Sequence, residues 1–289
     1  MKRENNIPQE LNPTIPLSEI KKGFKKWKER TLTSPSGLHL GHYKALLALD
    51  GTKYEKDSEN PSESIWHLIY IIINSSIQIG KGIDRWNRVN QLIMEKLYGD
   101  NRIHRTRNIN SYEADYNLSL KFFWPKTTIQ KEDASGSLGC NQYGGRKNRR
   151  SNDASFINEM IMEYHRMMYI TLSITQHDNT ACFDRTVENI TTLSNRKFNI
   201  QKKICSMTAQ IKKTIKYHVT TIHGQSTESY HHHKDSPVHG SWKGSGNAGT
   251  EWNFISIPLL KTMEETAEGC IIKGPRNITW KKNHPRICR

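Results

Sequence analysis

Cysteine is scarce in this sequence, and a long apolar run is missing from it. There are five cysteines, and no two of them have the Cys-x-x-Cys spacing, which argues against a zinc ribbon and against a disulfide framework. The most apolar stretch, residues 65–79, is interrupted by polar side chains and is shorter than the ~20 residues that cross a bilayer. The first residues are charged and lack the apolar segment of a secretory leader. We therefore expect an intracellular protein, cytoplasmic or nuclear, without a membrane partner.

Negative charge is also in short supply. The chain has 43 lysines and arginines against 28 aspartates and glutamates, a formal net charge of +15 at pH 7. A positive excess of this size indicates a polyanionic partner, with nucleic acid as the first expectation. An anionic membrane surface, or a solvated basic face that has no partner, also fits the composition.

Apolar residues recur with helical spacing in several stretches, and this periodicity predicts most of the secondary structure. Helices are expected at residues 18–30, 38–49, 65–79, 110–124, 153–168, 185–196, 200–213 and 250–265, and strand-like stretches at 91–96, 169–174, 215–223 and from 269 onward. Residues 126–152, rich in glycine and basic residues, are expected to be mobile, and residues 231–249 to form a loop. Helices followed by strands interleaved with helices indicate the α+β class.

The segment from Asp178 to Arg185, DNTACFDR, carries the strongest local signal of chemistry. It follows the apolar stretch 167–174, so Asp178 is expected at the C-terminal end of a buried strand. There its carboxylate would bind Mg²⁺, which takes hard oxygen ligands from a few carboxylates and shares its other positions with phosphates. Phe183 would form the floor beneath an incoming sugar. In the alternative interpretation both aspartates are turn residues, and Asp184, which precedes a predicted helix, is favoured as its N-cap.

This octet resembles the first palm motif of reverse transcriptases of the non-LTR retrotransposon type. Five other segments are similar to motifs of that family and occur in the family's order. They are residues 34–47 (SPSGLHLGHYKALL), 65–96 (IWHLIYIIINSSIQIGKGIDRWNRVNQLIMEK), 103–124 (IHRTRNINSYEADYNLSLKFFW), 141–154 (NQYGGRKNRRSNDA) and 236–255 (SPVHGSWKGSGNAGTEWNFI). The resemblance spans roughly residues 18–270 and implies a right-hand polymerase fold within the α+β class. It implies a flexible lead at 1–17, a fingers-like region at 18–165, a partial palm at 166–275, and a disordered or aberrant tail at 276–289.

The resemblance also implies roles for individual residues. Asp178 would be the catalytic residue that holds the metal ion, Mg²⁺, and Phe183 would screen the sugar. Lys96 and Arg107 match the fingers cations that grip a triphosphate, where a guanidinium makes two-pronged phosphate contacts. Ordinary surface charge is the alternative for both cations. The implied partners are RNA or an RNA/DNA primer–template, and a deoxynucleoside triphosphate.

The loop formed by Gly244, Ser245 and Gly246 matches the family's second palm motif, which supports template and nucleotide. Glycine at such a loop lets the backbone approach a ligand closely. The sequence departs from the family at Lys243, where a glutamine is usual, and at residues 147–148, where lysine and asparagine replace the usual Pro-Gly.

The largest departure from the family is the third palm motif, an Asp-Asp pair after apolar residues. No Asp-Asp pair occurs in this sequence, and its last aspartate is Asp235. Two Mg²⁺ ions ~3.5–4 Å apart need bridging negative charge, which one aspartate does not supply. The resemblance therefore implies an RNA-directed DNA polymerase lineage, truncated before the third palm motif and catalytically incomplete. A non-catalytic nucleic-acid-binding remnant is the alternative function.

Three short patterns suggest other functions. PSGLHLGHY, with His39 and His42, resembles the nucleotide-binding signature of class I aminoacyl-tRNA synthetases, although the stretch before it is polar and no Lys-x-Ser-Lys loop follows. Residues 244–249 match the GxGxxG pattern but follow a polar run instead of an apolar strand, so a dinucleotide site is not expected. The histidines at 231–233 and His239 would bind a transition metal or, as we favour, lie solvated in a loop.

Overall fold

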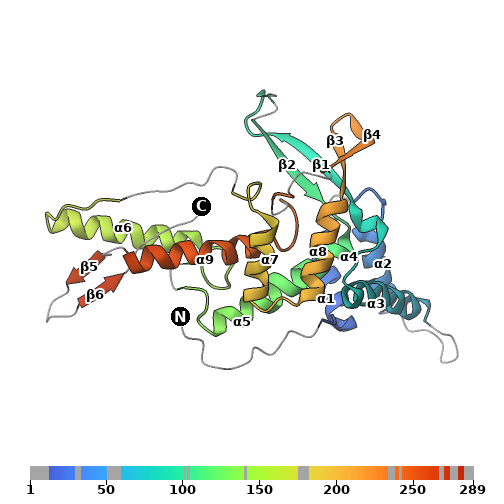
Figure 1. Ribbon diagram of the computed structural model, residues 1–289, viewed down its shortest axis with the longest axis horizontal. Coiled ribbons are helices and arrows are strands. Elements are labelled where there is room, and N and C mark those ends of the chain that lie inside the picture. The colour runs from blue at the N-terminus through green and yellow to red at the C-terminus, as the bar shows by residue number, and fades with distance from the viewer. Residues whose placement is uncertain are drawn as a thin grey trace.

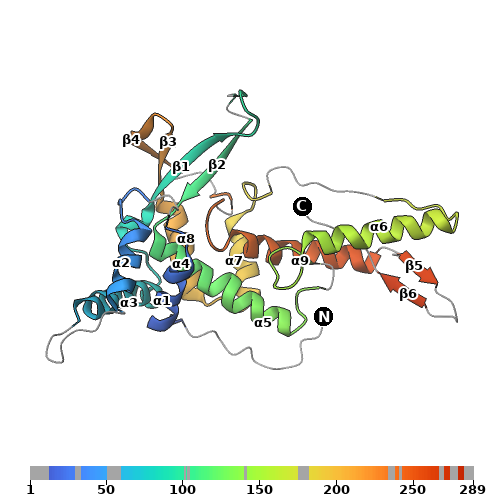
Figure 2. The ribbon, with the colours of Figure 1, turned by 180° about the vertical axis from the view of Figure 1, so that it is seen from behind.

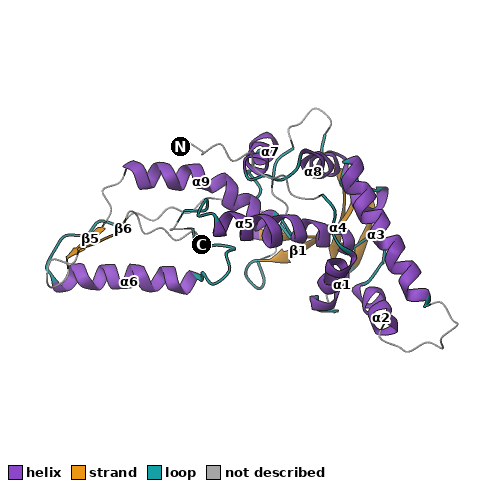
Figure 3. Cartoon of the chain, turned by 90° about the horizontal axis from the view of Figure 1, so that it is seen from below, coloured by secondary structure: helices purple, strands orange, loops and turns teal. Residues whose placement is uncertain are grey.

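The computed structural model contains helices and a small mixed β-sheet, which confirms the α+β class. It describes residues 13–29, 34–50, 60–100, 102, 105–139, 142–174, 182–233, 238–240, 243–266, 270–273 and 279–282. Most helices form one packed body with the four-stranded sheet at one end, and two long helices, α6 and α9, extend towards the other end (Figures 1 and 2). In the view of Figure 3 these two helices lie apart from each other, so their overlap in Figure 1 does not indicate contact.

The elements follow one another in the order helices, hairpin, helices, hairpin, helix, hairpin. The helices are α1 (Leu17–Lys26), α2 (Leu40–Asp50), α3 (Pro61–Ile79), the 3₁₀ turn η1 (Asp84–Asn87), α4 (Ala114–Lys121), the π-helical turn η3 (Phe122–Thr128), α5 (Ile129–Ala134), α6 (Ser151–Met167), α7 (Glu188–Lys197), α8 (Lys202–Thr214) and α9 (Ala248–Thr266). The strands are β1 (Arg88–Glu95), β2 (Thr106–Ser111), β3 (Lys216–Thr221), β4 (Gly224–His231), β5 (Cys270–Lys273) and β6 (Thr279–Lys282).

Helix α3 shows how local sequence signals set its ends. The Asn60 side chain accepts a hydrogen bond from the Ser62 amide, and Pro61 occupies the first helical position, where its missing N–H costs nothing. At the other end Gly80 adopts φ +75°, the left-handed conformation that closes helices without a Cβ clash. The helix expected at 65–79 is therefore confirmed, and it begins four residues earlier.

The main sheet has the strand order β2-β1-β3-β4. β1 pairs antiparallel with β2, parallel with β3, and β3 pairs antiparallel with β4. The strands expected at 91–96 and 215–223 are confirmed, and the loop expected from 231 begins after β4. The helix expected at 110–124 begins only at Ala114, because residues up to Ser111 belong to β2.

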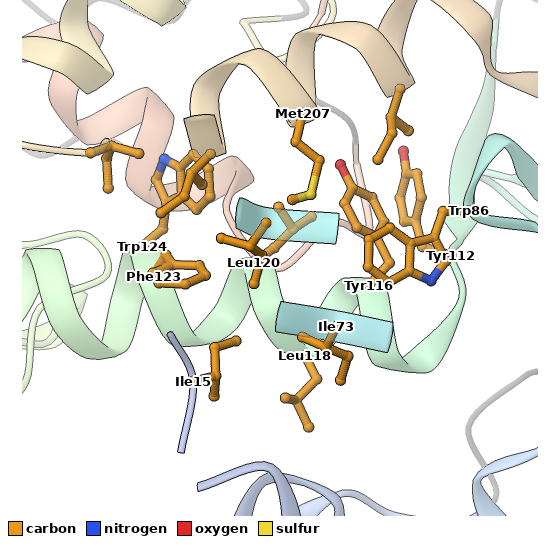
Figure 4. Close-up of a cluster of buried hydrophobic side chains, with 14 of the residues drawn as sticks. Ile15, Ile73, Trp86, Tyr112, Tyr116, Leu118, Leu120, Phe123, Trp124 and Met207 are labelled. Atoms are coloured by element: carbon orange, nitrogen blue, oxygen red, sulfur yellow. The ribbon is translucent and has the colours of Figure 1, made fainter. Parts of the chain in front are cut away.

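The hydrophobic core lies where α3, α4 and α8 meet. Leu118, Leu120 and Tyr116 from α4 meet Ile73 from α3 and Met207 from α8 (Figure 4). Next to them, Trp124 of η3 is fully buried and its indole N–H donates to Asn195 of α7 at 2.9 Å. Many residues of this core are large and aromatic, and such side chains bury the most area each.

A buried ionic cluster fixes the base of the β1–β2 hairpin. The Arg85 guanidinium in η1, just before β1, pairs with Glu113 at 2.8 Å and also with Asp115, both just after β2. The Trp86 indole N–H donates to Asp115 at 3.0 Å. Burial raises the pKa of Asp115, and the positive charge of Arg85 opposes that rise. These contacts therefore hold the start of β1 close to the end of β2 and the first turn of α4.

A second buried cluster joins α7, α8 and α9. The Lys212 ammonium of α8 lies 2.7 Å from the Glu188 carboxylate and 3.5 Å from that of Glu251. Asn195 and Asn247 donate to Glu251 at 3.1 and 2.8 Å. All three helices thus meet at one ammonium group, which is almost fully buried.

The chain leaves α-helical geometry at η3 because of Pro125. Proline has no N–H to give to a preceding carbonyl, and its ring crowds the turn before it. The hydroxyls of Thr127 and Thr128 donate instead to the carbonyls of Phe122 and Phe123, each at 2.7 Å. The widened turn continues directly from α4 into α5.

The prediction of a buried strand at 169–174 is wrong. After α6 ends, these residues form no strand, and Tyr169 is 97% exposed with a φ of +53°. An apolar run forms a strand only where it can pair with the edge of a sheet. α6 extends away from the main sheet, so the residues that follow it lie far from the edges of that sheet (Figure 1).

The segment 126–152, expected to be mobile, has helices and side-chain hydrogen bonds among the residues described there. Residues up to 134 are helical, and the buried Arg146 side chain donates to the backbone carbonyls of Leu138, Gly139 and Gln142 at 2.7–2.9 Å. One guanidinium therefore organises a stretch whose composition suggests flexibility. Within the expected flexible lead, Ile15 is fully buried and its N–H donates to Asn74 at 2.7 Å.

Candidate nucleic-acid interface

Lys96 and Arg107 lie on the same face of the β1–β2 hairpin. Arg107 pairs with Met94 across the hairpin, and the N–H of Lys96, two residues beyond Met94, donates to the Arg105 carbonyl at 3.3 Å. Directly paired residues of an antiparallel ladder, and residues two apart on one strand, point to the same side. Both side chains are exposed. Among the residues that the structure describes, neither has an ion-pair partner.

The Gly244–Gly246 loop is attached to β2 and α4. The Asn110 N–H of β2 donates to the Lys243 carbonyl at 3.0 Å. The Asn117 side chain of α4 donates to the Gly244 carbonyl at 3.2 Å and accepts from the Gly246 N–H. Two asparagines thus hold the loop at the foot of the hairpin that carries Arg107, with Ser245 half-buried between the glycines.

Glycine is required at both ends of this loop. Gly244 has a φ of +102°, and a Cβ there would lie 2.1 Å from the Asn110 carbonyl oxygen. A Cβ on Gly246 would lie 2.4 Å from Cγ of Lys121. The backbone of the loop therefore touches its neighbours directly, which no larger residue permits.

Phe183 and Asp184 lie beside the same loop region. The Phe183 ring is 6.0 Å from that of Trp252 in α9, centroid to centroid. The Asp184 carboxylate pairs with the Lys243 ammonium at 2.5 Å, and both side chains are about half exposed. The structure therefore brings together residues from the two segments that resemble palm motifs, 178–185 and 236–255.

The expectation that Asp184 caps a helix is wrong. α7 begins four residues later at Glu188, and Val187 is its N-cap residue. Asp184 instead binds Lys243, the residue at which the sequence differs from the second palm motif that it resembles. Neither residue alone signals this contact, because the partners are 59 positions apart.

Asp178, the predicted metal ligand, lies outside the described residues. Carboxylates on the neighbouring described segments are already committed: Asp184 to Lys243, and Glu188 and Glu251 to Lys212. No group of three or more possible metal ligands occurs in the part of the chain that the structure describes. The described carboxylates of these segments are therefore bound to lysines.

A cavity of about 210 Å³ opens beneath Gly244. Its walls include Trp27 at the end of α1, Ile109 and Asn110 of β2, and Asn117 of α4. The cavity lies where the hairpin meets the loop, and its lining includes Trp27 and Gly244, which are more than 200 positions apart in the sequence. From the sequence, Trp27 stands out only as one apolar position of a basic helix, so its place here was not predicted.

His39 and His42 interact with backbone at the start of α2. The His39 ring accepts from the Gly41 N–H at 3.0 Å, and the His42 ring lies 3.1 Å from the His39 N–H. A synthetase signature requires a strand before these histidines; residues 30–33 lie outside the described part of the chain, and residues 27–29 and 34–38 contain no strand. The described residues therefore give the synthetase interpretation no support.

Of the clustered histidines, His232 lies against the sheet. Its ring nitrogen is 3.2 Å from the Tyr217 hydroxyl, and its ring meets that of Tyr217 edge-on. Burial, with smaller contributions from His231 and His239, lowers the pKa of His232. This ring packs against the sheet instead of projecting from a loop.

Comparison with models of known protein families finds no match for this chain, and a search of curated proteins finds none either. Within the described ranges, no helix is both long and apolar enough to span a bilayer. The functional interpretation therefore rests on the motifs and on the geometry around the loop.

Proposed function

We propose that this chain is a reverse-transcriptase-like protein of retroelement origin that binds RNA or an RNA/DNA primer–template. The binding face runs from the β1–β2 hairpin to the Gly244–Gly246 loop. One observation carries the proposal. Lys96 and Arg107 share a face of the hairpin without ion-pair partners among the described residues, and the loop is hydrogen-bonded to the same strand at Asn110.

The chemistry of this face suits a phosphate backbone. Arg107 and Asn110 are three residues apart on one strand, a separation of about 10 Å. A guanidinium and an ammonium neutralise phosphates at one end of that distance, and the exposed Gly244 lies at the other. The net charge of +15 would steer polyanions towards the protein over longer range.

The ancestral reaction in this proposal is template-directed deoxynucleotide addition. The primer 3′-hydroxyl attacks the α-phosphate of the incoming nucleotide, and pyrophosphate leaves. The described carboxylates around the loop are all paired with lysines, and the sequence lacks the Asp-Asp motif. We therefore propose that these 289 residues bind primer–template without extending it.

Fluorescence anisotropy of a labelled RNA/DNA primer–template at rising salt tests the proposal. Affinity should fall steeply with salt, and Arg107→Gln or Lys96→Gln should each reduce the slope of log K against log salt by about 0.9. Arg166→Gln removes the same charge from α6, far from the hairpin (Figure 1), and should leave the slope unchanged. Equal effects of Arg107→Gln and Arg166→Gln would refute a defined face, and a flat salt response would refute binding through charge.

A further inference from the structure

A second cavity lies between α1 and the α4–η3 segment. Its volume is about 390 Å³, within the range of roughly 300–1,000 Å³ that small-molecule sites occupy. Gly23 helps to shape it, because a Cβ there would lie 2.6 Å from Leu118 of α4, so α1 can approach α4 this closely only with glycine. The π-helical turn η3 forms the opposite wall, and such turns are frequent at functional sites.

Four lysines and one glutamate line this cavity: Lys22, Lys26, Lys121, Lys126 and Glu19. Glu19 pairs with Lys126 and lies 3.9 Å from Lys22. The positive charges therefore exceed the negative charge within the cavity. Lysines gathered at one concave site repel one another, and an anionic ligand relieves that repulsion.

Two aromatic rings complete the lining. The Lys121 ammonium lies 3.7 Å from the ring centroid of Trp27, and the Lys126 ammonium 5.2 Å from that of Phe122. An aromatic face next to cations is the pairing that sites for single-stranded nucleic acid use, with bases on the rings and phosphates on the cations.

This cavity lies next to the loop region, because one residue lines both cavities. Trp27 lines both this cavity and the smaller one beneath Gly244. The stem of Lys121 lies against Gly246, where a Cβ would be 2.4 Å from its Cγ. A strand that follows the Gly244–Gly246 loop therefore arrives at Trp27 and Lys121.

We propose that the cavity between α1 and α4–η3 binds one nucleotide unit, its base stacked on Trp27 and its phosphate held by Lys121 and its neighbouring lysines. The inference rests on the proposed function: because the cavity lies next to the loop, we expect the nucleotide to belong to a single-stranded extension of the bound template. On binding, the Lys121 ammonium leaves the Trp27 face and turns to the phosphate. A free nucleotide carries the same two groups.

Protonation of Lys121 provides an independent readout. Burial lowers the pKa of Lys121 to about 8, so in the free protein this amine is charged below that pH and increasingly neutral above it. The charged groups around it are Glu19, Lys22 and Lys26 from α1, and Lys126 from η3. A bound phosphate favours the charged form, so affinity should fall as the pH rises above 8. Burial also lowers the pKa of Lys126, so Lys121→Arg, which stays charged, should reduce this pH dependence.

Anisotropy of a labelled single-stranded uridine oligonucleotide tests the site in the full chain. Lys121→Gln and Trp27→Leu should each weaken binding about tenfold. Lys25→Gln removes the same charge from an exposed position of α1 outside the cavity and should change affinity less than twofold. Equal affinity of Lys121→Gln and Lys25→Gln would overturn the proposal.

Primer–template without an overhang separates this site from the hairpin face. Lys121→Gln should keep its affinity for that duplex, and Arg107→Gln should lose duplex affinity while single-strand binding through the cavity persists. If Arg107→Gln has no effect but Lys121→Gln does, the proposed function fails and the cavity remains a nucleotide site. If Lys121→Gln lowers duplex and single-strand affinity equally, the cavity is not a separate site and the inference fails.

A covalent probe does not depend on the variants being folded. Wild-type protein irradiated with an oligonucleotide that contains 5-iodouridine should cross-link at Trp27, located by peptide mass spectrometry. Displacement by uridine monophosphate would assign the cavity to free nucleotides as well as strands, and its failure to displace the oligonucleotide would assign it to strands alone. Cross-links at other tryptophans, with none at Trp27, would overturn the proposal.

Discussion

Replacing Lys212 with methionine should destabilise the fold more than any surface change to the chain. The ammonium is almost fully buried between Glu188 and Glu251, which lie 2.7 and 3.5 Å away. Burial by itself would lower the pKa of Lys212, and the charges of Glu251 and Glu188 outweigh it, so the pKa is raised. The lysine therefore stays charged and binds both carboxylates.

The expected loss follows from what the substitution leaves behind. At an effective dielectric constant of about 20, the attraction to the nearer carboxylate is about 6 kcal/mol before desolvation is subtracted. Removing one partner from a buried ion pair typically costs about 3–5 kcal/mol, because the other charge stays buried and unpaired. We expect Lys212→Met to lower the free energy of unfolding by that amount.

Urea denaturation measures this loss of stability, and two control variants show whether it comes from the buried ion pairs. Lys213→Met makes the same change at the next residue, which is exposed, and should change stability by less than about 0.5 kcal/mol. Lys212→Met combined with Glu188→Gln and Glu251→Gln removes all three charges and should recover most of the loss. A Lys212→Met variant within about 1 kcal/mol of the wild type would refute the argument.

The raised pKa also fixes the pH range in which Lys212 stabilises the fold. The contribution is fully present below the unfolded pKa of about 10.4 and is lost only as the pH rises through the higher folded pKa. Between pH 6 and 9 the stability difference between wild type and Lys212→Met should therefore not decrease through deprotonation of this lysine.

Two further predictions concern the loop. Gly244→Ala combines a φ of +102° with a clash against the Asn110 carbonyl, so it should lower stability by about 1–3 kcal/mol and weaken primer–template binding. Gly37→Ala, at φ +73° with open space around it, should lose only the stability that the unfavourable backbone conformation costs and should bind primer–template normally. Equal binding defects in the two variants would contradict the assignment of the Gly244–Gly246 loop to the binding face. Asp184→Asn breaks a half-exposed pair and should change stability by less than about 1 kcal/mol, yet it frees Lys243 and should tighten primer–template binding in the anisotropy assay. Weaker binding by Asp184→Asn would count against Lys243 facing the nucleic acid.

Local signals in the sequence predict the helices well. The spacing of apolar residues locates α3 and α8, and Gly80 marks the end of α3, because these features act over a few residues. The strand expected at 169–174 shows where this logic stops. Its apolar residues resemble those of a buried strand, but pairing depends on a distant sheet edge that periodicity does not specify.

The candidate site depends on contacts between distant residues. Phe183 and Gly244 belong to two segments that resemble palm motifs, and these segments meet through the Asp184–Lys243 pair, a contact that the order of the motifs does not specify. Composition could not identify the role of Arg146, which satisfies three carbonyls in a glycine-rich stretch, since any arginine in so basic a chain resembles surface charge. Nor could it place Trp27 between two cavities.

The central claim is that the chain binds primer–template without extending it, and one sample tests both halves. A labelled DNA primer on an RNA template is titrated with the 289-residue protein at several salt concentrations, and deoxynucleotides with Mg²⁺ or Mn²⁺ are then added. We predict a complex whose affinity falls steeply with salt, and no lengthened primer. A flat salt response, or primer extension that disappears in an Asp178→Ala variant, would contradict the account.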